Sequence, residues 1–225
     1  MNLSPILVSM RTASAAIAVT FFLGVLAARV VAGINRKEIK MILDGILTLP
    51  LVLPPTVAGF FLLYIFGVRG PVGKFFLDFF SVRIAFSWSA TVIAAVTISF
   101  PLMYRSCRGA LEQVDPNLVY AARTLGLSEW AIFLKISLPT AMPGVASGAV
   151  LAFARGLGEF GATAMIAGNI AGKTRTLPLA VYSDVAAGNM EGAYGYVLII
   201  VIISFVVVAL MNYFTVQETK IRGKE

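Results

Sequence analysis

The chain has 225 residues, of which 59% are hydrophobic and 13% are charged, whereas soluble domains carry about 25% charged residues. This composition indicates a single integral membrane domain over residues 1–225 and excludes a sizeable soluble domain. The sequence has no histidine and one cysteine, Cys107, so we expect no catalytic residues, no bound metal and no cofactor. The net charge of +7 is typical of basic loops that orient a membrane chain, and we expect no nucleic-acid partner.

Five stretches are long and apolar enough to cross a membrane, since a helix rises about 1.5 Å per residue through a hydrocarbon layer about 30 Å thick. They are Thr12–Ala32, Gly45–Phe66, Trp88–Tyr104, Thr140–Ala167 and Ala193–Phe214. The first is longer than the apolar core of a typical signal peptide and four more follow it, so we interpret it as a span. The prediction is an all-α membrane protein with five transmembrane helices.

Two local features modify this pattern. Pro50, Pro54 and Pro55 remove backbone donors from the second span, which predicts a kinked helix facing protein or a water-filled cavity. The segment Gly70–Phe80 is too short to span, and its phenylalanines flank two charged residues, which predicts an interfacial stretch on the outer side.

Basic residues set the expected orientation. One side of the membrane would carry Arg36, Lys37, Lys40, Arg105, Arg108, Arg123, Lys135, Lys220, Arg222 and Lys224, and the other Arg11, Arg69, Lys74, Arg83, Lys173 and Arg175. This bias predicts an external N-terminus and a cytoplasmic C-terminus, with the segment after the third span in the cytoplasm. Arg29, at the end of the first span, can extend to the interface.

The segment from Asp115 to Pro139 is patterned but too polar to be a span. Asp115 and the proline after it are typical of a helix start, and Gly126 suits the residue after a helix end. Ser128 predicts a second start, and Leu138–Pro139 a break before the fourth span. We therefore expect two short amphipathic helices on the cytoplasmic face, which either form an ordinary interfacial loop or dock a cytosolic partner.

The same segment resembles the EAA loop of type I ABC importer permeases, on the residues Ala121, Ala122, Gly126, Ile136, Leu138 and Pro139. Tyr120 stands where that family most often has glutamate, so a salt bridge to the ATPase from this position is not implied. The resemblance implies a transmembrane domain over about residues 9–214 and a coupling loop over 116–139 that seats on the ATP-binding subunit. The implied coupling residues are Tyr120, Ala121, Ala122, Gly126, Leu127 and Ser128.

Three further stretches are similar to the molybdate/sulfate permease family: LPLVLPPTVAGF (Leu49–Phe60), FARGLGEFGATAMIAGNI (Phe153–Ile170) and TRTLPLAVY (Thr174–Tyr182). The resemblance implies a homodimeric, non-enzymatic permease in the cytoplasmic membrane, with two cytosolic ATPase subunits and an external oxyanion-binding protein. The expected substrate is molybdate, with tungstate as a second candidate. A sulfate or thiosulfate permease of the same architecture and, less favoured, a secondary anion transporter are the alternatives.

Several residues are candidates for the pathway or gate. Arg155 and Glu159 lie one helical turn apart inside the fourth span, where they form either a structural ion pair or part of a gate or dimer interface, and we expect Glu159 to be paired. The hydroxyls of Thr56, Ser147 and Thr163 could pass an oxyanion without trapping it. The stretch GNIAGKT (Gly168–Thr174) has one residue too few for a phosphate-binding loop. The apolar run after it predicts a re-entrant outer helix or a solvated loop with an interfacial helix.

Overall fold

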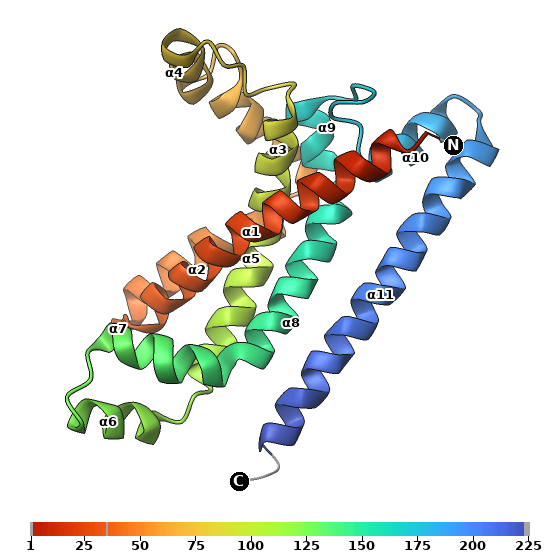
Figure 1. The fold of residues 1–225 in the computed structure, drawn as a ribbon. Coiled ribbons are helices and arrows are strands. Elements are labelled where there is room, and N and C mark those ends of the chain that lie inside the picture. Colours follow the sequence, from red (N-terminus) through yellow and green to blue (C-terminus); the bar gives the residue numbers. More distant parts are fainter. Residues whose placement is uncertain (1, 35, 223–225) are drawn as a thin grey trace.

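The computed structural model describes residues 2–34 and 36–222, with side chains as far as Tyr213, so Lys224 of the orientation argument lies outside the described residues. All regular elements in these ranges are helical (Figure 1). They are α1 (Ser4–Ala32), α2 (Lys37–Val52), α3 (Pro55–Phe66), α4 (Pro71–Phe80), α5 (Trp88–Glu112), α6 (Pro116–Thr124), α7 (Glu129–Ile132), the π-helical turn η1 (Phe133–Ser137), α8 (Leu138–Leu157), α9 (Gly161–Ala167), α10 (Leu177–Ala186) and α11 (Met190–Arg222).

Four helical runs of the described chain are long and apolar enough to cross a membrane: Ser4–Ala32, Trp88–Glu112, Glu129–Leu157 and Met190–Tyr213. Helices α2 and α3 together are also long and apolar enough, but they are bent by 108° at a short break, so the pair is either a broken fifth span or a re-entrant loop. The all-helical prediction is confirmed, and the five predicted spans correspond to these four runs and the bent pair.

The bend between α2 and α3 follows from the prolines. Pro54 and Pro55 have no backbone donor, so α2 ends where the Leu53 amide bonds to the Leu49 carbonyl. The new helix starts with the amides of Val57 and Ala58 on the Pro54 carbonyl. Pro50, within α2, does not interrupt that helix. The predicted kink is thus confirmed as a nearly perpendicular break.

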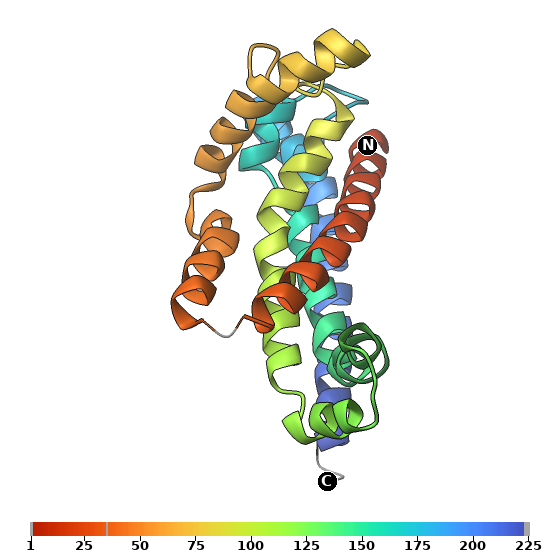
Figure 2. The same ribbon diagram turned by 90° about the vertical axis from the view of Figure 1, so that its left-hand side faces the viewer.

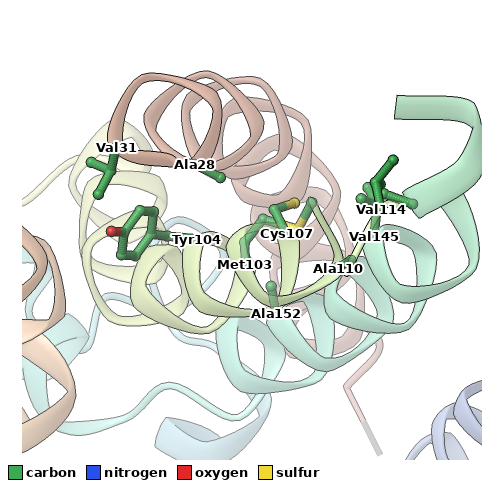
Figure 3. Packing of buried hydrophobic residues seen from close by; sticks show 10 residues of the cluster. Ala28, Val31, Met103, Tyr104, Cys107, Ala110, Val114, Val145 and Ala152 are labelled. Carbon is green, nitrogen blue, oxygen red and sulfur yellow. The ribbon is translucent and has the colours of Figure 1, made fainter. Parts of the chain in front are cut away.

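The core lies where α1, α5 and α8 pack against one another. Figure 3 shows Ala28, Met103, Cys107, Val145 and Ala152 among its buried side chains. Small residues allow this close packing, and a Cβ on Gly148 of α8 would overlap the Ser106 side chain of α5. A glycine at this position therefore lets α5 and α8 approach closely.

Hydroxyl pairs link α1 to α5 across the same contact. The Thr12 and Thr91 hydroxyls are 2.9 Å apart, and those of Thr20 and Ser99 are 3.3 Å apart. Inside a bilayer such bonds satisfy polar groups that lipid cannot. The α1–α5 pair is therefore joined by both packing and hydrogen bonds.

Two expected boundaries were wrong. The fourth span ends at Leu157, and a break over residues 158–160 separates it from the short helix α9. At its other end, Leu138–Pro139 does not break the helix, which runs without interruption from Glu129 through η1 into α8. The π-helical turn ends at Ser137, two residues before Pro139, so the hydrogen-bonding pattern already changes where the proline amide is missing, and the helix continues.

Different helices lie at the two ends of the bundle. In Figures 1 and 2, α6 and α7 lie at the same end as the end of α11, whereas the start of α1, α4 and α10 lie at the opposite end. The residues that resemble a coupling loop therefore share one end with the C-terminal helix end, as the predicted topology requires.

Candidate functional site

The first helix of the coupling segment, residues 115–139, begins and ends as its sequence predicts. The Asp115 carboxylate accepts a hydrogen bond of 2.9 Å from the Asn117 amide, and Pro116 occupies the first helical position. Gly126 has φ of +76°, and the next amide, that of Leu127, bonds back to the Ala122 carbonyl at 3.2 Å. Both predicted boundaries of α6 are confirmed.

The second helix starts at Ser128, also as predicted. Its hydroxyl accepts a hydrogen bond of 3.3 Å from the Ala131 amide, which makes it the N-cap of α7. Glu129 lies in the first turn, where a negative charge suits the helix dipole.

An ion pair that the sequence did not indicate joins the two helices. Arg123 donates from Nε to Oε1 of Glu129 at 2.7 Å and from Nη2 to Oε2 at 3.1 Å. This two-bonded contact with the carboxylate raises the pKa of the Arg123 guanidinium above its ordinary value. The two residues are six apart across a glycine turn, a spacing that no helical periodicity marks. The pair connects α6 to α7 through two half-exposed side chains.

The implied coupling residues fall into two groups. Tyr120, Ala121, Gly126, Leu127 and Ser128 are exposed, whereas Ala122 is buried and holds α6 in place. Leu125 and Trp130, exposed by 81% and 58%, add large apolar side chains that the resemblance did not include. The segment thus presents a partly apolar surface suited to a protein partner.

The Arg155–Glu159 pair forms at the break after α8. Arg155 Nη1 donates to Glu159 Oε2 at 2.8 Å, and Glu159 Oε1 accepts from the Ala162 amide at 2.8 Å. The Glu159 side chain is 1% exposed, so both of its oxygens are used in the interior. The expectation that Glu159 is paired is confirmed, and its second contact anchors the start of α9.

The three hydroxyl candidates lie on different elements. Thr56 is exposed in the first turn of α3, Ser147 is partly buried on α8, and Thr163 is fully buried on α9. Helices α3 and α9 are packed together, because a Cβ on Gly161 would lie 3.2 Å from the Thr56 amide. Of the three, Thr56 is the most exposed, Ser147 is partly exposed and Thr163 is closed off.

The loop after α9 contains the short apolar helix α10 (Leu177–Ala186), which both expected arrangements of this stretch include. Its first amide, that of Leu177, donates to the Ser9 hydroxyl of α1 at 2.7 Å. The stretch before it closes on itself, since the Thr174 hydroxyl accepts from the Ile170 amide at 2.9 Å. A phosphate-binding loop requires a helix directly after its Gly-Lys-Thr triplet, and none begins there.

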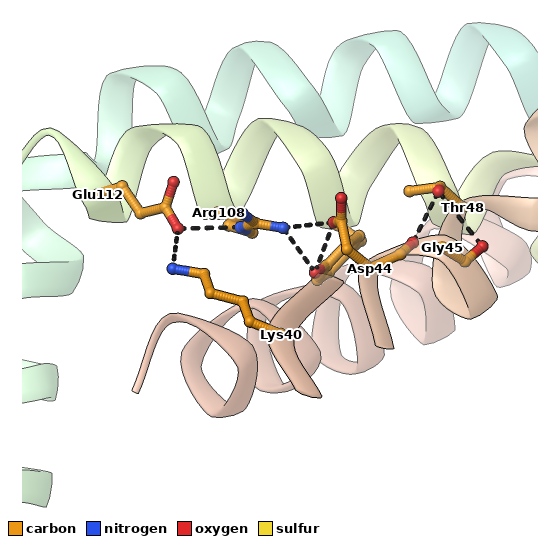
Figure 4. A network of polar contacts seen from close by, with 7 residues as sticks. Lys40, Asp44, Gly45, Thr48, Arg108 and Glu112 are labelled. Carbon is orange, nitrogen blue, oxygen red and sulfur yellow. Dashed lines mark hydrogen bonds and ion pairs between the residues drawn. The ribbon is translucent and has the colours of Figure 1, made fainter. Parts of the chain in front are cut away.

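A charged network between α2 and α5 was not foreseen (Figure 4). Asp44 accepts hydrogen bonds from Arg108 and, at 3.0 Å, from the Tyr104 hydroxyl. Glu112 bonds to Arg108 Nε at 2.9 Å and to Lys40 Nζ at 2.7 Å. None of the α2 residues is buried, so these polar contacts are a main attachment of that helix. Among the described side chains, no cluster of acidic residues or cysteines could hold a metal.

The sequence matches the family model described as "Binding-protein-dependent transport system inner membrane component" over residues 12–217. It is 52% identical over 155 residues to the molybdenum transport system permease protein ModB of Escherichia coli (strain K12), covering 68% of each chain. It is 41% identical over 186 residues to ModB of Haemophilus influenzae, covering 82% of this chain and 81% of that protein. The sulfate transport system permease protein CysW of Synechocystis is more distant, at 33% over 176 residues, covering 78% of this chain and 63% of that protein.

The fold is also found among solved structures. A chain of the bacterial alginate ABC transporter, in complex with a periplasmic protein carrying an alginate pentasaccharide, superposes with a TM-score of 0.73. The match covers 97% of this chain and 79% of that one at 15% sequence identity. The similarity at this identity is one of fold, and it is the fold of type I ABC importer permeases.

Proposed function

Because the chain belongs to the family of binding-protein-dependent transport system inner membrane components, we propose that it is the membrane-spanning permease subunit of an ATP-driven molybdate importer. The observation that carries this proposal is the identity of 52% and 41% to relatives named as molybdenum transport permeases. Tungstate, a chemically similar oxyanion, is the second candidate substrate. Sulfate is the alternative, supported only by the relative with 33% identity.

The coupling segment is the part of the chain on which the ATP-driven movements of the ATPase subunits would act. Two cytosolic ATP-binding subunits would seat against α6 and α7, and a second copy of this chain would complete the pathway. Hydrolysis would take place in those partners, so the permease itself would make and break no bonds. The residues proposed to contact or position them are Tyr120, Ala121, Ala122, Gly126, Leu127 and Ser128.

An external oxyanion-binding protein would deliver the substrate at the opposite end. This requires the N-terminus outside and the C-terminus in the cytoplasm, so that α10 faces the binding protein and α6 faces the ATPase. The location of the start of α1 and the end of α11 at opposite ends of the bundle supports this topology (Figure 1).

The pathway residues have distinct proposed roles. Thr56, exposed beside the bend between α2 and α3, and Ser147 on α8 would offer hydroxyl donors to a passing oxyanion. Thr163 is enclosed within the protomer and would reach the pathway only when α9 moves. Arg155 and Glu159 would hold the α8–α9 break in shape, and the pairing of Glu159 keeps a bare carboxylate away from the anion.

The test is transport by purified components. The permease is reconstituted in proteoliposomes with its ATPase subunits, and the loaded binding protein is supplied on the opposite side. We expect uptake of labelled molybdate that requires ATP and is not displaced by excess sulfate. Preferential uptake of sulfate would favour the alternative permease, and uptake driven by an ion gradient without the ATPase would identify a secondary transporter.

A further inference from the structure

Arg29 links the end of α1 to the second coupling helix. Its Nη2 donates a hydrogen bond of 3.2 Å to the backbone oxygen of Glu129. Its guanidinium carbon lies 5.7 Å from the ring centre of Trp130 and 5.0 Å from that of Phe133. The Arg29 side chain of α1 therefore contacts three groups of α7 and η1: the Glu129 backbone oxygen, the Trp130 ring and the Phe133 ring.

The surroundings of Arg29 are not solidly packed. A half-open pocket of about 150 Å³ lies between the last turn of α1 and the coupling segment, with Gly33 and Ser137 among its lining residues. The Arg29 Nε is buried and has no hydrogen-bond partner among the described residues. The Arg29 side chain thus spans a region with space for movement. Its unpaired Nε–H can donate a hydrogen bond when the coupling segment takes up a different position.

Arg29 contacts Glu129, the residue of α7 to which movements of both coupling helices are transmitted. The Arg123–Glu129 ion pair ties α6 to α7, so a displacement of either helix reaches Glu129. From there the backbone continues through η1 into α8 without a break. The carbonyl that Arg29 holds belongs to the same Glu129.

We propose that Arg29 is a positioning residue that transmits movement of the coupling segment to α1, in parallel with the direct path through η1 into α8. This inference rests on the proposed function. Without Arg29, α8 still receives the displacement but α1 does not follow it, although both helices pack on α5. ATP hydrolysis then continues with less anion moved per cycle.

The experiment compares Arg29→Gln and Arg29→Lys with Arg36→Gln as the matched control. Arg36 is an exposed arginine seven residues further along the chain, and its side chain makes no hydrogen bond, ion pair or cation–π contact among the described residues, so its loss removes the same charge. Each variant is assembled with the ATPase subunits and binding protein in proteoliposomes. Molybdate uptake and phosphate release are measured in the same vesicles.

For Arg29→Gln we expect assembly at the wild-type level and a rise of about fivefold to tenfold in ATP hydrolysed per molybdate transported, since the cation–π contacts are lost. Arg29→Lys keeps the charge but not the planar group, and it should recover only part of the coupling. Arg36→Gln should match the wild type. A merely structural role would lower assembly or stability and leave this ratio unchanged.

Further variants separate the outcomes. Phe133→Leu removes the ring closest to Arg29 at a buried position, away from the exposed partner surface. It should raise the same ratio on its own, and adding it to Arg29→Gln should cause less than the sum of the two effects. If Arg29→Gln fails to assemble, Phe133→Leu decides. An unchanged ratio in the assembled variants overturns the role of Arg29, whereas a wild-type complex without ATP-dependent uptake contradicts the proposed function instead.

Discussion

At Gly126 the backbone has φ of +76°, a conformation that residues with a side chain adopt only at a cost. The space around its Cα is open, since a Cβ there would meet no atom within 4 Å. The requirement for glycine therefore comes from the backbone angle and not from crowding. Asparagine tolerates this region better than other residues, whereas a β-branched residue does not.

This difference predicts that Gly126→Val weakens association with the ATPase subunits and that Gly126→Asn does not. The valine costs about 1–2 kcal/mol at the turn and shifts α6 relative to α7. Co-purification of tagged permease with the ATPase measures the effect, with Gly109→Val, at an uncrowded site on α5, as a control for valine itself. Equal recovery of the Val and Asn variants would show that the turn does not set the docking surface.

Glu159 carries two contacts that can be separated by substitution. Glu159→Gln keeps an oxygen for the Ala162 amide but loses the charge that faces Arg155, and Glu159→Ala loses both. We expect the alanine variant to lose about 3 kcal/mol or more of stability and the glutamine variant distinctly less. Thermal unfolding of the detergent-solubilised protein measures this order. Identical melting temperatures for the two variants would mean that the Ala162 contact contributes nothing.

At the scale of elements, α2 is held to α5 more by charge than by burial. Leu43 and Leu47 pack only partly against the core that contains Cys107, while Asp44 and Arg108 form the central ion pair. Releasing this pair should let α2 move away from α5. The bend at Pro54 leaves α3 in place when this happens, because α3 packs separately on α9.

Asp44→Asn should therefore increase the reaction rate of Cys107 with a small thiol reagent by about fivefold to tenfold, through more frequent local opening. Cys107 is the only cysteine in the chain and is fully buried in the core against which Leu43 and Leu47 of α2 pack, so its labelling rate reports opening of that core. Glu38→Gln, at an exposed position on the same helix, is the control and should label at the wild-type rate. Unchanged labelling of Asp44→Asn would show that the network does not hold α2.

The elements also show which features a sequence can predict. Helix starts at Asp115 and Ser128, the turn at Gly126 and the proline bend depend on neighbouring residues, so local patterns were sufficient. The Arg123–Glu129 and Asp44–Arg108 pairs depend on how helices meet in space, which no spacing rule encodes. The continuity of α7 with α8 is not predictable from local pattern, because a proline usually ends a helix and no residue spacing marks the π turn before it.

For the whole molecule, the account requires that the coupling segment face the cytoplasm while α10 faces outward. Hydropathy indicated the number of spans, and the basic residues indicated their orientation. In the proposed dimer, a second copy of the chain would determine which residues line the pathway, and for that reason Thr56, Ser147 and Thr163 stay predictions. Orientation, in contrast, can be measured on the intact membrane.

The most direct measurement is labelling of Leu125→Cys and Ala187→Cys with a membrane-impermeant thiol reagent in vesicles of both orientations. Both positions are exposed, and native Cys107 is buried and gives little background. We expect the residue 125 thiol to react only from the cytoplasmic side, with protection by bound ATPase, and the residue 187 thiol only from outside. Labelling of Leu125→Cys from the external side would contradict the account, because no cytosolic ATPase could then act on this segment.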